Sequence, residues 1–111
     1  MKRISLIAAA TLALLGATAA QARSFDAIQK DGTLRLATEG YYAPFAYFEG
    51  KKLVGFEVDL AELMAQKMGV KFEWKTIPFD SLLTGLSQDR WDLVISSHGI
   101  TPEREKAVTF T

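Results

Sequence analysis

Between residues 33 and 96 the hydrophobic pattern alternates between the period of a strand and the period of a helix. Residues 33–38 alternate apolar and polar side chains after the turn pair Asp31-Gly32, and residues 70–77 alternate in the same way, so both ranges predict strands. The apolar run at residues 92–96 predicts a third, buried strand. Strands and helices in alternation are typical of an α/β fold in which helices cover both faces of a parallel sheet.

The segments between these strands predict two helices and a hairpin. The longer helix begins near residue 56 and carries an apolar stripe at helical spacing on one face. The stripe consists of Phe56, Leu60, Leu63, Met64 and Met68. Gly69 follows the stripe where a C-terminal cap is expected. Residues 80–88 predict a shorter helix, residues 46–48 and 53–54 a small hairpin, and residues 39–45 a loop broken by glycine and proline.

Composition removes several function classes. The chain has 111 residues, with 13 basic and 13 acidic side chains, one histidine and no cysteine. Nucleic-acid binding requires clustered basic residues, and no such cluster is present. Without cysteine there is no disulfide, thiolate zinc site or cysteine nucleophile. The single histidine, His98, lacks partners for a metal site or a catalytic triad, and no glycine-rich phosphate motif occurs, so we expect no cofactor and no metal.

Residues 1–22 have the features of a secretory signal peptide. Lys2 and Arg3 precede an apolar run at residues 4–20, and Ala20-Gln21-Ala22 matches the small-x-small pattern of a cleavage site. A membrane anchor is the competing interpretation, but much of the run is alanine and its leucine-rich part is short. We therefore expect cleavage after Ala22 and release of residues 23–111 into the periplasm.

Two loops follow predicted strands at their carboxyl ends, where open parallel sheets bind ligands: residues 39–45 and 97–101. In the second loop, Thr101 is a good N-cap for a helix starting at Pro102. Gly99 allows close approach of the backbone, and Arg104 can donate two parallel hydrogen bonds. These features predict a seat for a carboxylate. An alternative for Arg104 is a solvated helix residue paired with a neighbouring glutamate.

Aromatic residues surround the first loop. Tyr41 and Tyr42 are adjacent and in regular structure cannot both point inward, which leaves one of them free to face the cleft. Phe79 precedes the second predicted helix and has two interpretations of equal weight. It is either a wall of the ligand cleft or a hydrophobic contact that fixes the start of that helix.

Several spaced motifs resemble those of the family 3 periplasmic solute-binding proteins, which serve polar amino-acid ABC transporters. They lie at residues 42–45 (YAPF), 53–60 (LVGFEVDL), 91–94 (WDLV), 99–104 (GITPER) and 110–111 (FT). The resemblance covers essentially all of residues 23–111 and follows a predicted export signal. It implies a monomeric two-lobed clamp that closes on an amino acid and delivers it to a permease of the inner membrane.

The resemblance also implies roles for individual residues. Tyr42 and Phe79 would line the side-chain pocket, whereas Ser97 and Gly99 would offer backbone or hydroxyl contacts. Thr101 and Arg104 would hold the α-carboxylate of the ligand, and Ser96 would end the strand. Glu39 lies where some members carry an acid near a basic ligand's side chain, which favours a cationic amino acid.

The same resemblance implies that residues 23–111 are the N-terminal part of lobe 1, a fragment of the parent architecture, because the family continues into a hinge and a second lobe. We expect a binding protein and not an enzyme. The alternative is a cyclohexadienyl dehydratase on the same fold, in which the arginine would hold a carboxylate while a general acid assists loss of water. Glu39 is the cleft-side candidate for that acid.

Overall fold

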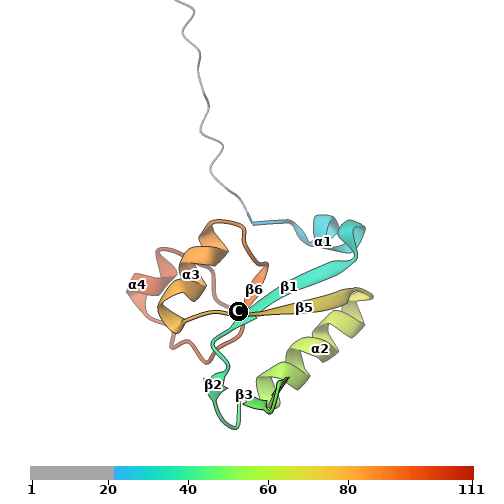
Figure 1. Ribbon diagram of the computed structural model, residues 1–111. Coiled ribbons are helices and arrows are strands. Elements are labelled where there is room, and N and C mark those ends of the chain that lie inside the picture. Colours follow the sequence, from blue (N-terminus) through green and yellow to red (C-terminus); the bar gives the residue numbers. More distant parts are fainter. Residues whose placement is uncertain (1–21) are drawn as a thin grey trace, which may run out of the picture.

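The structure, a computed structural model, describes residues 22–111, so the predicted signal peptide lies outside the described residues except for Ala22. Figure 1 shows the order of the elements along the chain. The helices are α1 (Phe25–Asp31), α2 (Phe56–Met68), α3 (Phe79–Ser87) and α4 (Pro102–Glu105). The strands are β1 (Thr33–Thr38), β2 (Tyr41–Tyr42), β3 (Ala46–Glu49), β4 (Lys52–Val54), β5 (Lys71–Thr76) and β6 (Leu93–Val94).

The central sheet is parallel, with β1 between β5 and β6. Thr33 to Thr38 pair in register with Lys71 to Thr76, and Leu36 and Ala37 pair with Leu93 and Val94. A second, antiparallel sheet of order β2-β3-β4 extends the loop that follows β1. The predicted α/β fold with a parallel sheet is therefore confirmed.

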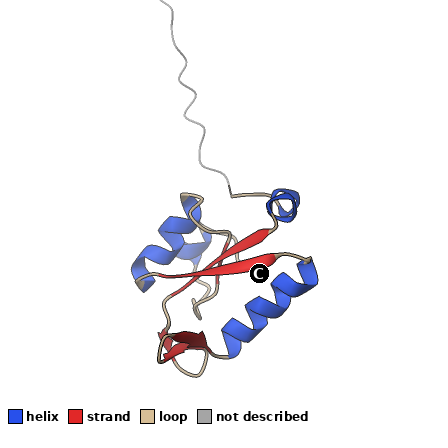
Figure 2. Ribbon diagram, turned by 45° about the vertical axis from the view of Figure 1, so that its right-hand side comes forward, coloured by secondary structure: helices blue, strands red, loops and turns tan. Residues whose placement is uncertain are grey.

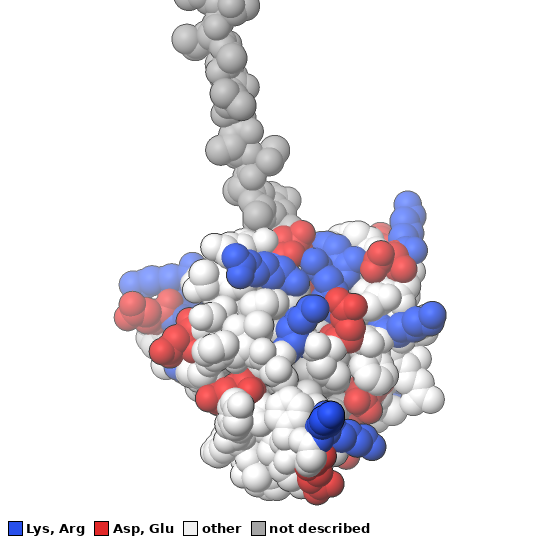
Figure 3. Space-filling view, viewed as in Figure 1, with Lys and Arg blue, Asp and Glu red and all other residues white. Residues whose placement is uncertain are grey.

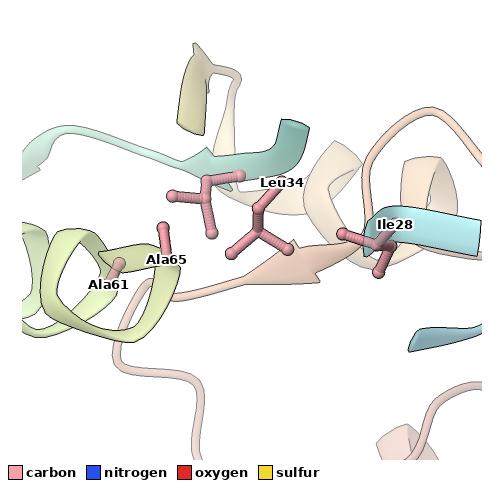
Figure 4. Close-up of a cluster of buried hydrophobic side chains, with 5 residues drawn as sticks. Ile28, Leu34, Ala61 and Ala65 are labelled. Carbon is pink, nitrogen blue, oxygen red and sulfur yellow. The ribbon is translucent and has the colours of Figure 1, made fainter. Parts of the chain in front are cut away.

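Helices lie on both sides of the sheet (Figure 2) because β1 alternates its side chains between the two faces. On one face Leu34 and Leu36 pack with Ile28 of α1 and with Ala61 and Ala65 of α2 (Figure 4). A second cluster, formed by Ala37, Leu82 of α3 and Trp91, packs separately. The alternation of apolar residues in β1 thus places α2 and α3 on opposite faces.

The apolar stripe predicted for α2 is not its buried face. The helix buries Val58, Ala61 and Ala65, whereas the side chain of Phe56 is 65% exposed and that of Leu63 is 48% exposed. Because the side chains of Ala61 and Ala65 are small, α2 can approach the leucines of β1 closely. Of the predicted stripe, Phe56, Leu60, Leu63 and Met64 consequently remain exposed, whereas Met68 packs against the core.

Two short elements were not predicted. Helix α1 has clear end signals, since Ser24 caps its start by accepting a hydrogen bond from Ala27 N–H and Gly32 ends it in the left-handed conformation. Strand β2 occupies part of the predicted loop and pairs Tyr41 with Tyr47 and Tyr42 with Ala46.

The predicted buried strand at residues 92–96 is shorter and less buried than expected. Only Leu93 and Val94 form β6, and both are half-buried, because within residues 22–111 this strand has a neighbour on one side only. The chain turns away at Ser97, which has a φ of 51°.

An ion-pair cluster joins the start of the described chain to the sheet. The Asp92 side chain is 2% exposed and accepts hydrogen bonds from the guanidinium groups of both Arg23 and Arg35. The Arg35 backbone N–H also donates to Asp92, at 2.9 Å. These bonds outweigh the effect of burial and hold the pKa of Asp92 well below its usual range.

Candidate functional site

The loops that follow β1 and β6 meet at one end of the sheet, because these parallel strands are neighbours. Ser96, which is buried, links the two loops. Its hydroxyl oxygen accepts hydrogen bonds from the Glu39 backbone N–H at 3.1 Å and from the Thr38 hydroxyl at 3.4 Å. The two loops predicted to form the ligand site are therefore brought together.

Arg104 lies in the short helix α4, directly after the second loop. Thr101 caps α4 by accepting a hydrogen bond from Arg104 N–H at 3.2 Å, and Pro102 occupies the first turn. The Arg104 side chain folds back, with Nη1 donating to the carbonyl of Gly99 at 2.9 Å. Within residues 22–111 Arg104 forms no ion pair with a glutamate, so its remaining donors are available to an anion.

Phe79 contacts both the core and the residues of the second loop, while its role as a wall of the ligand cleft stays a prediction. It packs against the cluster of Ala37, Leu82 and Trp91. Its ring also stacks on the imidazole of His98, with centroids 4.1 Å apart, and the guanidinium carbon of Arg104 lies 5.6 Å from its centroid. Burial, together with the positive charge of Arg104, lowers the pKa of His98, whereas Glu57 opposes this shift.

Acidic and aromatic residues border a hollow of about 450 Å³ beside this stack. Its lining consists of Glu39, Tyr41, Thr76, Ile77, Pro78, Phe79 and Asp80. Two carboxylates and two aromatic rings suit a cationic group, because rings and carboxylates both attract positive charge. Asp80 is the acidic residue that sequence reasoning missed here.

Tyr42 does not border this hollow. Its side chain is 52% exposed and lies 5.1 Å from Phe45, measured between ring centroids. Tyr41, 83% exposed, is the tyrosine that borders the hollow. Tyr41 is thus the tyrosine beside the hollow, while a tyrosine facing the ligand cleft and a ligand contact by Tyr42 stay predictions.

The hydroxyl of Ser97 donates a short hydrogen bond to the carboxylate of Glu57 at the start of α2. Ser97 and Gly99 are both exposed. Glu57 was not among the predicted site residues, although it lies in the motif at residues 53–60. Its position as an acid in the first turn of a helix was visible in the sequence, but its contact with a residue forty positions away was not.

Charge distribution, metal-ligating side chains and helix length are the other features of residues 22–111 that bear on function. Figure 3 shows Lys and Arg intermixed with Asp and Glu on the face it displays. Residues 22–111 hold no group of three or more His, Asp or Glu side chains arranged for a metal ion. In the same residues, every helix is too short or too polar to cross a membrane.

Comparison with known proteins gives a family match. Residues 34–111 match the model of the bacterial extracellular solute-binding proteins, family 3. A probable amino-acid ABC transporter-binding protein of Haemophilus influenzae is 38% identical over 87 residues, which cover 78% of this chain and 34% of that protein. The arginine-binding extracellular protein ArtP of Bacillus subtilis is 44% identical over 78 residues, covering 70% of this chain and 31% of the relative.

An enzyme is also among the relatives. The cyclohexadienyl dehydratase of Pseudomonas aeruginosa is 36% identical over 107 residues, which cover 94% of this chain and 40% of the enzyme. The chain therefore spans about a third of the length of the curated relatives it matches.

Solved structures share the fold. An ancestral cationic amino acid solute-binding protein superposes with a TM-score of 0.72 at 38% identity, covering 76% of this chain and 37% of that one. The arginine-bound form of domain 1 from TmArgBP superposes with a TM-score of 0.69 at 34% identity, covering 71% of this chain and 64% of that domain. Isolated domains with this architecture have thus been solved with arginine bound.

Proposed function

The chain belongs to the bacterial extracellular solute-binding proteins of family 3, and from that premise we propose that it binds an amino acid outside the inner membrane for delivery to an ABC transporter permease. Residues 1–22 would be removed as a signal peptide, with cleavage after Ala22. Residues 23–111 would then contribute the first wall of the ligand site in a monomeric protein.

One observation carries this proposal: Arg104 lies at the site with donors free. Its Nη1 bonds to the carbonyl of Gly99, a neutral acceptor, and within residues 22–111 no carboxylate neutralises its charge. A guanidinium has five N–H donors and matches a carboxylate through two parallel bonds. Arg104 and Thr101 would therefore hold the α-carboxylate of the ligand.

We propose a cationic amino acid as the ligand. The hollow beside Arg104 is bordered by Glu39 and Asp80 and by the rings of Tyr41 and Phe79, a combination that attracts a positively charged side chain. ArtP is named for binding arginine, and the similar domain 1 from TmArgBP was solved in its arginine-bound form, which supports this ligand class. Tyr42, Ser97 and Gly99 complete the proposed contacts.

A dehydratase is the second candidate, because the Pseudomonas aeruginosa enzyme is a relative. Glu39 borders the hollow and is the proposed general acid for that reaction, and Asp80 is a second carboxylate there. We favour the binding protein, because the other two curated relatives described above are named for binding and the hollow combines negative charge with aromatic rings.

Calorimetric titration of the whole gene product, isolated from the periplasm, tests the proposal. Arginine or lysine should bind, neutral amino acids should bind more weakly, and acidic ones should not bind. A cyclohexadienyl carboxylate is offered to the same preparation while the absorbance of an aromatic product is followed. Turnover without amino-acid binding would favour the enzyme, and neither activity would refute both.

A further inference from the structure

Glu57, the second residue of α2, contacts both loops that border the proposed amino-acid site. Its backbone N–H donates to the carbonyl oxygen of Phe45 at 2.9 Å, in the loop between β2 and β3. Its side-chain carboxylate accepts the hydroxyl hydrogen bond of Ser97, in the loop after β6. The start of α2 is thus bonded to one loop through its backbone and to the other through a side chain.

The contact with the first loop is fixed by the backbone at Gly55. This residue has a φ of +129°, and a Cβ there would lie 2.3 Å from the carbonyl oxygen of Phe45. The adjacent Phe56 N–H also donates to the carbonyl of Pro44, at 3.1 Å. Only glycine permits this close approach, so the loop at residues 44–45 lies directly against the first turn of α2.

The contact with the second loop involves a strained residue. Ser97 has a φ of 51°, in the left-handed region that a residue with a side chain adopts at a cost in free energy. A hydrogen bond to a carboxylate is stronger than one between neutral groups and offsets this cost. Two residues later, the carbonyl of Gly99 accepts the bond from Arg104, so Ser97 lies close in the chain to the backbone group that holds the Arg104 side chain.

We propose that Glu57 is a positioning residue of the amino-acid site: its carboxylate keeps Ser97 in the left-handed conformation and thereby fixes Gly99 and Arg104 relative to the loop at residues 44–45. The second carboxylate oxygen, Oε2, is buried without a hydrogen-bond partner among residues 22–111, so within these residues Ser97 is the contact that orients the carboxylate. The ligand-binding consequence of this role rests on the proposed function, whereas the conformational role does not.

The test compares Glu57→Ala and Glu57→Gln with the control Asp59→Ala. Asp59 is exposed and lies in the same first turn of α2, so the control matches the loss of a negative charge at the helix start. Amide NMR spectra of the 111-residue chain report on the loops. Arginine titration of the whole gene product reports on binding.

Glu57→Ala should shift the amide resonances of residues 97–100 and leave that of Phe45 in place, because the backbone bond to Phe45 remains. It should weaken arginine binding about tenfold, the loss expected for one hydrogen bond to a charged group. Glu57→Gln retains an acceptor oxygen without the charge, so it should restore part of the loop resonances and part of the arginine affinity. Asp59→Ala should change neither.

The double variant Glu57→Ala with Ser97→Ala should lose no more arginine affinity than Ser97→Ala alone, because Ser97→Ala already removes the bond to Glu57 along with the proposed ligand contact of Ser97. Equal effects of Asp59→Ala and Glu57→Ala, or shifts confined to α2, would overturn the positioning role. A wild-type protein that binds no amino acid would refute the proposed function instead, and the amide shifts would still decide the role of Glu57.

Discussion

At the scale of single residues, three arginines of the described chain differ in what they bond to. Arg23 and Arg35 both donate to the buried carboxylate of Asp92. Arg104 instead donates to a carbonyl and lies over the ring of Phe79. A guanidinium that meets no carboxylate within residues 22–111 keeps donors for an incoming anion, which makes Arg104 the residue whose loss should affect binding most.

Arg104→Ala should weaken amino-acid binding by about 2 to 5 kcal/mol in the whole gene product, because it removes a charge-assisted contact from the site. Arg104→Lys should recover part of this loss, since an ammonium group cannot reproduce the planar fork of the guanidinium. Calorimetric titration of the three proteins measures the effect. Unchanged affinity in the alanine variant would return Arg104 to the role of a surface residue.

His98 should make the stability of the chain depend on pH. Burial and Arg104 lower its pKa in the folded state, so the unfolded chain, with an ordinary histidine pKa of about 6.5, binds the proton more readily. The free energy of unfolding should therefore fall as the pH is lowered through that ordinary value. His98→Leu should show a smaller fall between pH 7.5 and pH 5.

Urea unfolding at the two pH values measures this difference, and the wild-type chain at pH 7.5 is the reference. His98 is the only histidine of the chain, so its NMR titration can be followed without assignment ambiguity. Equal pH dependence in wild type and His98→Leu would contradict the contribution of His98.

Sequence reasoning at this scale succeeded where a residue's role is local. The N-cap at Thr101 followed from residues within one turn, and the structure shows it. The bond between Ser97 and Glu57 and the bond between Arg23 and Asp92 join residues 40 and 69 positions apart. Side-chain contacts of that range depend on how the sheet and helices assemble, and no spacing rule reports them.

At the scale of elements, the sequence pattern predicted β1, α2 and the hairpin of β3 and β4, but it missed α1 and β2. The strand at residues 33–38 and the helix from residue 56 match β1 and α2. Strand β2 has two residues and α1 has seven, too few for a period to emerge. The stripe on α2 misled because Ala61 and Ala65 form most of its contact with the sheet, and Met68 is the one stripe residue that packs against that core.

Helix α3 packs closely against Trp91, and Gly85 is the residue of the helix that makes room for the ring. A Cβ on Gly85 would lie 1.9 Å from a ring carbon of Trp91, whose side chain is buried and donates its indole N–H to the carbonyl of Leu82 at 2.9 Å. Gly85→Ala should therefore lower the free energy of unfolding by about 3 kcal/mol or more, because the ring has to move.

The exposed Thr84→Ala on the same helix is the matched control and should change stability little. Both variants are best made in a Trp74→Phe background, since the chain has two tryptophans and Trp91 then reports alone. Denaturant unfolding followed by Trp91 fluorescence measures the effect. In Gly85→Ala we expect unfolding at a lower denaturant concentration and a red-shifted Trp91 emission in the folded state. A stable variant with native emission would show that α3 and Trp91 are packed less closely than the structure has them.

At the scale of the whole molecule, the order of strands and helices was enough to predict the architecture and the end of the sheet that holds the site. Parallel strands bring their carboxyl ends together, so the loops after β1 and β6 meet without any contact being known beforehand. The resemblance supplied what periodicity could not, namely which residues in those loops would touch a ligand. The placement of Tyr41 rather than Tyr42 beside the hollow depends on the pairing of β2 and was not available from the sequence.

The 111-residue chain on its own should bind arginine with a dissociation constant of about millimolar or weaker. In the proposed clamp residues 22–111 would provide one wall of the site, and an amino acid offers only about ten non-hydrogen atoms, so micromolar affinity requires nearly every contact that a closed clamp supplies. The isolated domain 1 from TmArgBP, solved with arginine bound, makes arginine the most sensitive probe of such one-walled binding. Titration followed by NMR measures this affinity, and Arg104→Ala is the control that should abolish the response.

Light scattering should accompany the titration, because the exposed Phe56 and Leu63 of α2 favour self-association. Micromolar binding by a monomeric chain would mean that the loops after β1 and β6 form the complete site, and the clamp would then not be needed for affinity.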